Sequence, residues 1–174
     1  FGRVHCAFNN AGVPDQSHSM LTSTQGNWDR IMAINMEGVW HSMKAEIEHM
    51  LEAGGGAIVN NSSRSGLVGV PTDAIYGAAK HGVIGLTRAA GADYGPHGIR
   101  VNAVLPGITR TPMIARLSED PQLSAVFDRL RSRHSMGRFG EPAEIGESVK
   151  WLLSDDASFM NGAAVAIDGG YLSI

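Results

Sequence analysis

The sequence predicts an α/β fold built on a parallel sheet with helices on both faces. Short apolar segments that end in turn-type residues alternate along the chain with longer segments of helical periodicity. The apolar segments lack the alternation of a half-exposed strand, which is typical of strands buried on both faces. The 22 glycines have no collagen-like period and indicate many tight turns.

The elements follow in chain order from these patterns. The predicted strands are residues 4–8, 57–60, 99–105 and 163–167, and the predicted helices are 27–53, 76–94 and 141–153. One or two short helices are expected within 109–140. Ser23 or Thr24 can cap the first helix, and Gly38 predicts a kink or a junction inside it.

Composition excludes several classes of protein. The 174 residues include 17 acidic and 14 basic side chains, a balance that gives no reason to expect a nucleic-acid surface. No apolar run approaches the ~20 residues of a membrane helix. The single cysteine, Cys6, excludes an internal disulfide and fits a reducing compartment, so a cytoplasmic location is expected. The seven histidines are scattered without a His-Glu-x-x-His motif, and no metal site is expected.

Tyr76 and Lys80 are the first candidates for chemistry. Their spacing of four residues puts both side chains on one face of a predicted helix. A nearby ammonium favours a phenolate and lowers a pKa that is ordinarily about 10, so the pair can move a proton at an alcohol or carbonyl. The same spacing also occurs by chance on ordinary helices.

Polar and small residues follow the predicted strands, at the edge where doubly wound sheets bind ligands. Ser63 can hold a substrate oxygen there, although a serine at a strand end is also an ordinary turn or cap. Residues 9–12 and 106–107 close two other strands with small side chains that allow a cofactor to approach the backbone. Asn35 is an amide in an apolar helical setting, where it can also be a satisfied structural residue.

In this order and spacing, the segments resemble the short-chain dehydrogenase/reductase family. The resemblance runs from Val4 almost to the C-terminus, and it implies a Rossmann-like doubly wound parallel sheet. The matching pieces are Asn9-Asn10-Ala11-Gly12, Ile31-Met32-Ala33-Ile34-Asn35, Ile58-Val59-Asn60-Asn61-Ser62-Ser63, Tyr76-Gly77-Ala78-Ala79-Lys80, Ile99 to Gly107, Thr111-Pro112-Met113 and Asp168-Gly169-Gly170.

The resemblance implies hydride transfer between NAD or NADP and a secondary alcohol or ketone. Tyr76 is then the general acid in reduction and the base in oxidation, and Lys80 lowers its pKa and binds the nicotinamide ribose. Ser63 orients the substrate oxygen, and Asn35 holds a water that relays protons from Lys80. Besides Tyr76 and Lys80, the implied cofactor contacts are Asn9, Ala11, Gly12, Pro106, Gly107, Ile108 and Thr111.

One part of the family pattern is absent from the sequence. The glycine turn Thr-Gly-x-x-x-Gly-x-Gly does not occur, and residues 54–56 do not replace it because they follow a helix and precede a strand. We therefore expect residues 1–174 to be the C-terminal catalytic portion of one NAD(P)-binding domain of roughly 250 residues. The first βαβ units would be missing, and this chain alone is expected to bind nicotinamide cofactor weakly or not at all.

Other interpretations stay open at this stage. Sugar-nucleotide epimerases and dehydratases share the Tyr-x-x-x-Lys pair but carry a larger C-terminal domain, and a non-catalytic scaffold or regulator can keep the same fold. The sequence does not separate NAD from NADP or name the alcohol or carbonyl substrate. The family resemblance also implies a homotetramer, with the helices around residues 35–50 and 76–94 at one interface.

Overall fold

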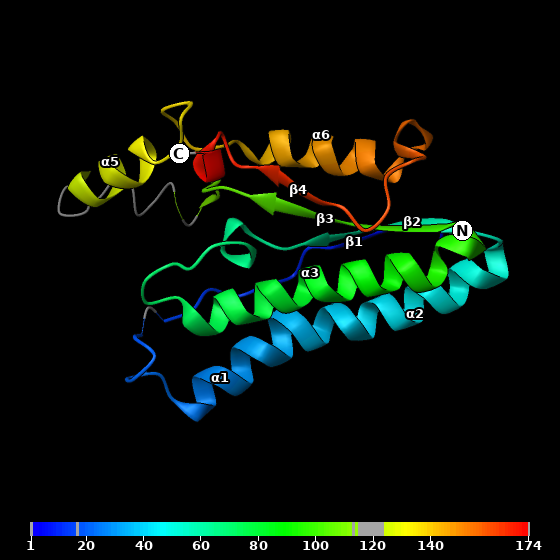
Figure 1. Ribbon diagram of the computed structural model, residues 1–174, viewed down its shortest axis with the longest axis horizontal. Coiled ribbons are helices and arrows are strands. Elements are labelled where there is room, and N and C mark those ends of the chain that lie inside the picture. Colours follow the sequence, from blue (N-terminus) through cyan, green and yellow to red (C-terminus); the bar gives the residue numbers. More distant parts are fainter. Residues whose placement is uncertain (1, 17, 113, 115–123, 174) are drawn as a thin grey trace.

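The computed structural model describes residues 2–16, 18–112, 114 and 124–173. Its centre is a parallel sheet of four strands in the order β1-β2-β3-β4 (Figure 1). The strands are β1 (Cys6–Asn9), β2 (Gly56–Asn61), β3 (Ile99–Pro106) and β4 (Ala164–Ile167). The helices are α1 (Gln25–Met32), α2 (Gly38–Ala53), α3 (Ala74–Tyr94), α5 (Ser124–Ser132) and α6 (Pro142–Leu153).

The predicted α/β class is confirmed, because helices cover both faces of the parallel sheet (Figure 1). Side chains on a strand alternate between the two faces. In β2, Ile58 joins the core with α2 and α3, and its neighbour Val59 packs on the opposite face against Val149 and Leu152 of α6. Both strand residues are fully buried, which explains why the strands read as continuous apolar runs.

The predicted first helix is interrupted where the sequence suggested a junction. Thr24 caps α1, accepting a hydrogen bond from the Asn27 N–H at 3.2 Å. Residues Ala33–Glu37 then form a π-helical turn, and α2 starts at Gly38. Such turns are wider than an α-helix and occur often at functional sites. Here the turn carries Asn35, one of the predicted site residues.

Several predicted boundaries differ from the structure by one or two residues. The first strand begins at Cys6, two residues later than expected, and among the described strands it lies at one edge of the sheet, paired with β2. The helix predicted at 76–94 begins at Ala74, so that Tyr76 lies in its first turn. Within the described ranges, no helix is both long and apolar enough to span a membrane.

Candidate active site

The predicted site residues follow three strands whose ends lie at one edge of the sheet. β1, β2 and β3 run parallel with consecutive pairing, so their carboxyl ends meet at the same edge. Asn9, Asn61 and Pro106 mark these three ends. The chain therefore brings segments separated by almost a hundred residues to one place.

Tyr76 and Lys80 lie together on the first turns of α3, as their spacing predicted. The Lys80 ammonium is 5.5 Å from the centre of the Tyr76 ring. It donates a hydrogen bond to the backbone oxygen of Asn61, at the end of β2, at 2.7 Å. Lys80 is only 2 % exposed. The lysine is thus held inside the fold, between the end of β2 and the start of α3.

The two serines that follow β2 have different contacts. The Ser62 hydroxyl donates to the backbone oxygen of Lys80 at 2.9 Å and so ties the end of β2 to α3. The Ser63 side chain lies close enough to Tyr76 to lower the pKa of the phenol. Its oxygen also accepts from the Ser65 N–H at 3.2 Å, capping a short 3₁₀ turn. Ser63, Tyr76 and Lys80 therefore form one cluster, with Ser62 as its anchor.

Burial dominates the protonation of this cluster. It raises the pKa of Tyr76, and the nearby Ser63 side chain offsets only part of that effect. Burial also lowers the pKa of Lys80 to about 8. The predicted direction for Tyr76 was wrong, because loss of water around the phenol outweighs the charges near it. A phenol is already protonated at neutral pH, and the raised pKa extends that form to higher pH.

Asn35 connects the π-helical turn to the loop after β1. Its side-chain oxygen accepts from the Val13 N–H at 2.8 Å, and its amide donates to the Val13 oxygen at 2.9 Å. A Cβ on Gly12 would lie 2.8 Å from the Asn35 oxygen and 3.6 Å from the Lys80 nitrogen. Gly12 therefore lies close to the side chains of both Asn35 and Lys80. A water relay through Asn35 stays a prediction.

The asparagine at the end of β1 points inward. Its amide donates to Asn60 at 2.9 Å and to the Glu46 carboxylate at 3.0 Å, so both N–H bonds are used within the protein. Burial raises the pKa of Glu46, and the hydrogen bond from Asn9 opposes that shift. Any contact of Asn9 with a cofactor is left to its backbone or its side-chain oxygen. Ala11 is exposed and lines a cavity of about 470 Å³ beside the end of β1.

The predicted residues after β3 lie next to the end of β4. The Gly107 N–H donates to the Ile167 oxygen at 3.0 Å, which extends the pairing of the two strands. Gly107 and Ile108 line a cavity of about 300 Å³. Thr111 is exposed, and its N–H donates to the Thr109 oxygen at 2.8 Å. Met113 of the predicted motif and residues 115–123 lie outside the described residues.

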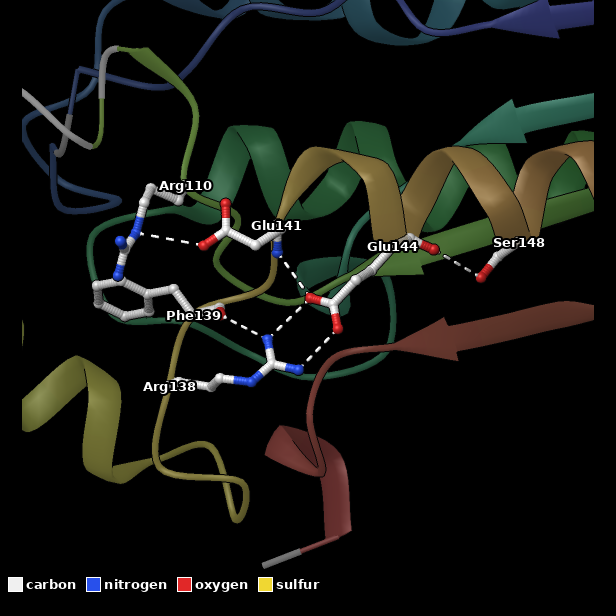
Figure 2. Close-up of polar contacts among 6 residues, drawn as sticks. All are labelled: Arg110, Arg138, Phe139, Glu141, Glu144 and Ser148. Carbon is white, nitrogen blue, oxygen red and sulfur yellow. Dashed lines mark hydrogen bonds and ion pairs between the residues drawn. The ribbon is translucent and has the colours of Figure 1, made fainter.

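A polar cluster that was not predicted from the sequence borders this cavity (Figure 2). Arg138 makes two hydrogen bonds to the Glu144 carboxylate, at 2.7 and 2.8 Å, and these bonds lower the pKa of Glu144 to about 2. Glu144 also accepts from the Glu141 N–H at 2.8 Å, and Arg110 lies 3.6 Å from the Glu141 carboxylate. The Glu-x-x-Glu spacing at the start of α6 is a capping signal and could have pointed to this cluster.

His134 was also missed as a contact of this turn. Its ring meets Ile108 across 26 residues of sequence, and no local motif signals that contact.

Comparison with known proteins agrees with this arrangement. The family model described as enoyl-(acyl carrier protein) reductase matches residues 1–172. Cyclohexanol dehydrogenase of Acinetobacter sp. (strain SE19) is 43 % identical over 173 residues, which cover 99 % of this chain and 66 % of that protein. Levodione reductase of Leifsonia aquatica is 39 % identical over 174 residues, covering 98 % and 65 %. The chain spans about two thirds of the length of these curated relatives.

Solved structures give the same result. The crystal structure of levodione reductase superposes with a TM-score of 0.94 at 38 % identity, covering 99 % of this chain and 68 % of that one. ElxO with NADP bound has a TM-score of 0.92 at 33 % identity, covering 100 % and 69 %. The chain belongs to the short-chain dehydrogenase/reductase family.

Proposed function

We propose that the protein is an NAD(P)-dependent oxidoreductase that interconverts a secondary alcohol and a ketone. The observation that carries the proposal is the cluster at the carboxyl edge of the sheet, in which the half-buried Tyr76 lies beside the buried side chains of Ser63 and Lys80. Several family relatives are named as alcohol dehydrogenases or reductases, which supports the same activity.

The residues present fit a nicotinamide cofactor. Lys80 has three N–H donors, and in the described part of the chain only the Asn61 oxygen accepts one at hydrogen-bond distance. The remaining donors suit the hydroxyls of a ribose. The cavities beside Ala11 and Gly107 offer room at the same edge. The solved structure of ElxO has NADP bound, while for this chain NAD and NADP stay alternatives.

Each residue of the cluster has a distinct role in this proposal. When bound, the nicotinamide ring supplies or accepts the hydride. The Tyr76 phenol, which is protonated at neutral pH, donates its proton to the carbonyl oxygen in reduction and takes it back in oxidation. The Ser63 hydroxyl orients and polarises that oxygen. Lys80 holds the ribose, and Asn35 positions the loop at Gly12 beside it.

The remaining proposed cofactor contacts lie at the ends of β1 and β3. Asn9, Ala11 and Gly12 line the ribose region, and Asn9 does so through its backbone or side-chain oxygen. The turn after β3 binds the nicotinamide end. Its proposed contacts are Pro106, Gly107, Ile108 and Thr111.

Relatives also suggest a substrate class. Two of them are named for cyclohexanol and for cis-4-hydroxycyclohexanecarboxylate, at 43 % and 40 % identity. A third is named for a chlorinated cyclohexadiene diol, at 45 % identity. We therefore propose an alcohol or ketone on a six-membered carbocycle as the first substrate to test.

The outer surface of α2 and α3 supports self-association, with a homotetramer as the family resemblance implies. A cavity of about 380 Å³ lies between these helices, lined by Trp40, Met43 and Leu86 among others. Trp40 and Leu51 are each more than two fifths exposed there. Light scattering of the intact protein tests this, and a monomer at micromolar concentration would refute it.

Replacing Tyr76 by Phe tests the activity. In the intact protein, Y76F should lower kcat for cyclohexanone reduction with NADH or NADPH by about 10²- to 10⁴-fold. The matched control is Y94F, at the far end of α3 and packed against the core, which should stay within about twofold of the wild type. The proposal would be refuted if Y76F turned over an alcohol or ketone with NAD(P) as fast as the wild type does.

A further inference from the structure

The chain leaves the end of β3 and returns to the start of α6 at one point. Thr109 and Gly140 pair there as an isolated parallel bridge. The Gly140 N–H donates to the Ile108 oxygen at 2.9 Å, and the Arg110 N–H donates to the Gly140 oxygen at 2.8 Å. The flanking ion pairs of Figure 2 are exposed, and exposed pairs contribute little stability. The ion pairs therefore do not account for the position of the turn.

His134 is the buried polar side chain at this point, and none of the roles proposed above uses it. It follows α5 and is 2 % exposed. Its ring stands edge-on to Phe139 and to Tyr171, with ring centres 5.7 and 5.1 Å apart. Its Nε2 lies 3.1 Å from the Ile108 nitrogen, and its Nδ1 lies 3.0 Å from the Leu130 oxygen.

These two partners assign the tautomer of the ring. A backbone N–H can only donate, so Nε2 accepts from Ile108. A carbonyl oxygen can only accept, so Nδ1 carries the hydrogen and donates to Leu130. In this arrangement His134 is a neutral imidazole, and Nε2, its one acceptor atom, accepts from the Ile108 N–H.

The turn after β3 is packed between this ring and the end of β4. A Cβ on Gly107 would lie 2.9 Å from the His134 Nε2 and 2.9 Å from the Asp168 Cα. Asp168 in turn accepts from the N–H groups of Gly170 and Leu172, at 3.0 and 2.9 Å, which orders the segment that carries Tyr171. The turn thus has a rigid support on each side.

We propose that His134 is a positioning residue for the turn Pro106–Ile108. By accepting the Ile108 N–H, it sets where the backbone of this turn meets the nicotinamide end of the cofactor. The catalytic consequence rests on the proposed function, whereas the hydrogen bond and the tautomer do not. Because a displacement of about 1 Å can cost a reaction two orders of magnitude, a loosened turn should lower kcat.

Two variants of the intact protein separate positioning from packing. H134F keeps an aromatic ring but has no acceptor for the Ile108 N–H. H134Q offers a side-chain oxygen near the position of Nε2. The control is H49F, since His49 is exposed on α2. The measurements are kcat and KM for cyclohexanone with NADH or NADPH, hydrogen exchange of the Ile108 amide, and the ring ¹⁵N shifts of His134 in the wild type.

The proposal expects a neutral Nδ1–H ring in the wild type. In H134F, the hydrogen of the Ile108 amide should exchange at least tenfold faster than in the wild type, and kcat should be at least tenfold lower. H134Q should stay within about threefold of the wild type in both the exchange rate and kcat. H49F should match the wild type in both quantities. A purely structural histidine would leave kcat of the folded H134F unchanged, and that result overturns the proposal. A hydrogen on Nε2 in the wild type, or exchange in H134F at the wild-type rate, also overturns it.

Two further outcomes are decided in advance. If H134F does not fold, the wild-type tautomer and the exchange rate in H134Q decide the matter. If Y76F keeps full turnover, the proposed function fails, but the tautomer and the exchange rates still test the hydrogen bond on their own.

Discussion

Replacing Lys80 by Met should make the folded protein more stable while abolishing its proposed function. The pKa of Lys80 falls from 10.5 to about 8 because its ammonium is buried. At 1.36 kcal/mol for each pKa unit, keeping this ammonium charged in the fold costs about 3 kcal/mol at pH 7. Methionine has nearly the same length and carries no charge, so K80M removes that cost.

A second effect opposes the first. K80M also removes the 2.7 Å hydrogen bond to the Asn61 oxygen and leaves a carbonyl without that donor. An unsatisfied buried acceptor costs about 1–3 kcal/mol. The net change at pH 7 is therefore expected to lie between about 0 and 2 kcal/mol in favour of K80M.

The pH dependence isolates the cost of the buried charge. The folded pKa is lower than the unfolded one, so the penalty is complete below pH 8 and is relieved as pH rises toward 10.5. Between pH 7 and pH 9.5, the free energy of unfolding of the wild type should therefore rise by about 2 kcal/mol relative to that of K80M. The hydrogen-bond effect does not follow this slope, because a neutral amine still donates to Asn61.

Urea unfolding at four pH values between 7 and 9.5 measures this slope. The control is K150M, because Lys150 is exposed (76 % of its side chain) and pairs only with Glu147 in the described part of the chain. K150M should track the wild type to within about 0.5 kcal/mol at every pH. A difference between wild type and K80M that does not change with pH would refute the reasoning. A K80M variant that is less stable than the wild type by more than about 1 kcal/mol at pH 7 would also refute it.

Three other predictions follow from the same contacts. Gly12→Ala puts a Cβ 2.8 Å from the Asn35 oxygen, so we expect thermal unfolding to show a loss of about 1–3 kcal/mol and kcat to fall with it. Arg138→Gln removes both hydrogen bonds to Glu144, so NMR titration should find the pKa of Glu144 raised from about 2 toward its ordinary range. Because both partners are exposed, stability should change by less than about 1 kcal/mol. The pKa of Tyr76 is raised, so the difference in absorbance at 295 nm between wild type and Y76F, which reports the phenolate, should appear only above pH 10. The stability of the wild type should fall in the same pH range, because the unfolded chain releases the Tyr76 proton at a lower pH than the folded protein does.

The sequence predicted the elements well because their signals are local. An apolar run with a glycine or asparagine stop identifies a strand, and the cap at Thr24 and the junction at Gly38 both occur where the pattern indicated. The grouping of Tyr76, Lys80 and Ser63 also followed from sequence, since helical spacing and strand ends determine it. The roles of these residues in catalysis, and the weak cofactor binding expected of this chain alone, stay predictions.

Other features depend on contacts between distant segments. The direction of the pKa shift at Tyr76 depends on how deeply the phenol is buried, and spacing along a helix carries no information about burial. The inward orientation of Asn9 depends on Asn60 and Glu46, which belong to other elements. The contact of His134 with Ile108 depends on how the segment around α5 returns to the sheet.

The sequence alone therefore determined the α/β class, the order of the elements and which residues share the carboxyl edge. These follow from periodicities of two and of 3.6 residues and from the rule that parallel strands end on the same side. Only the tertiary structure decided the protonation of the cluster, the inward turn of Asn9 and the support of the turn after β3. Burial and hydrogen-bond partners decide each of these, and both exist only once segments far apart in the chain have packed together.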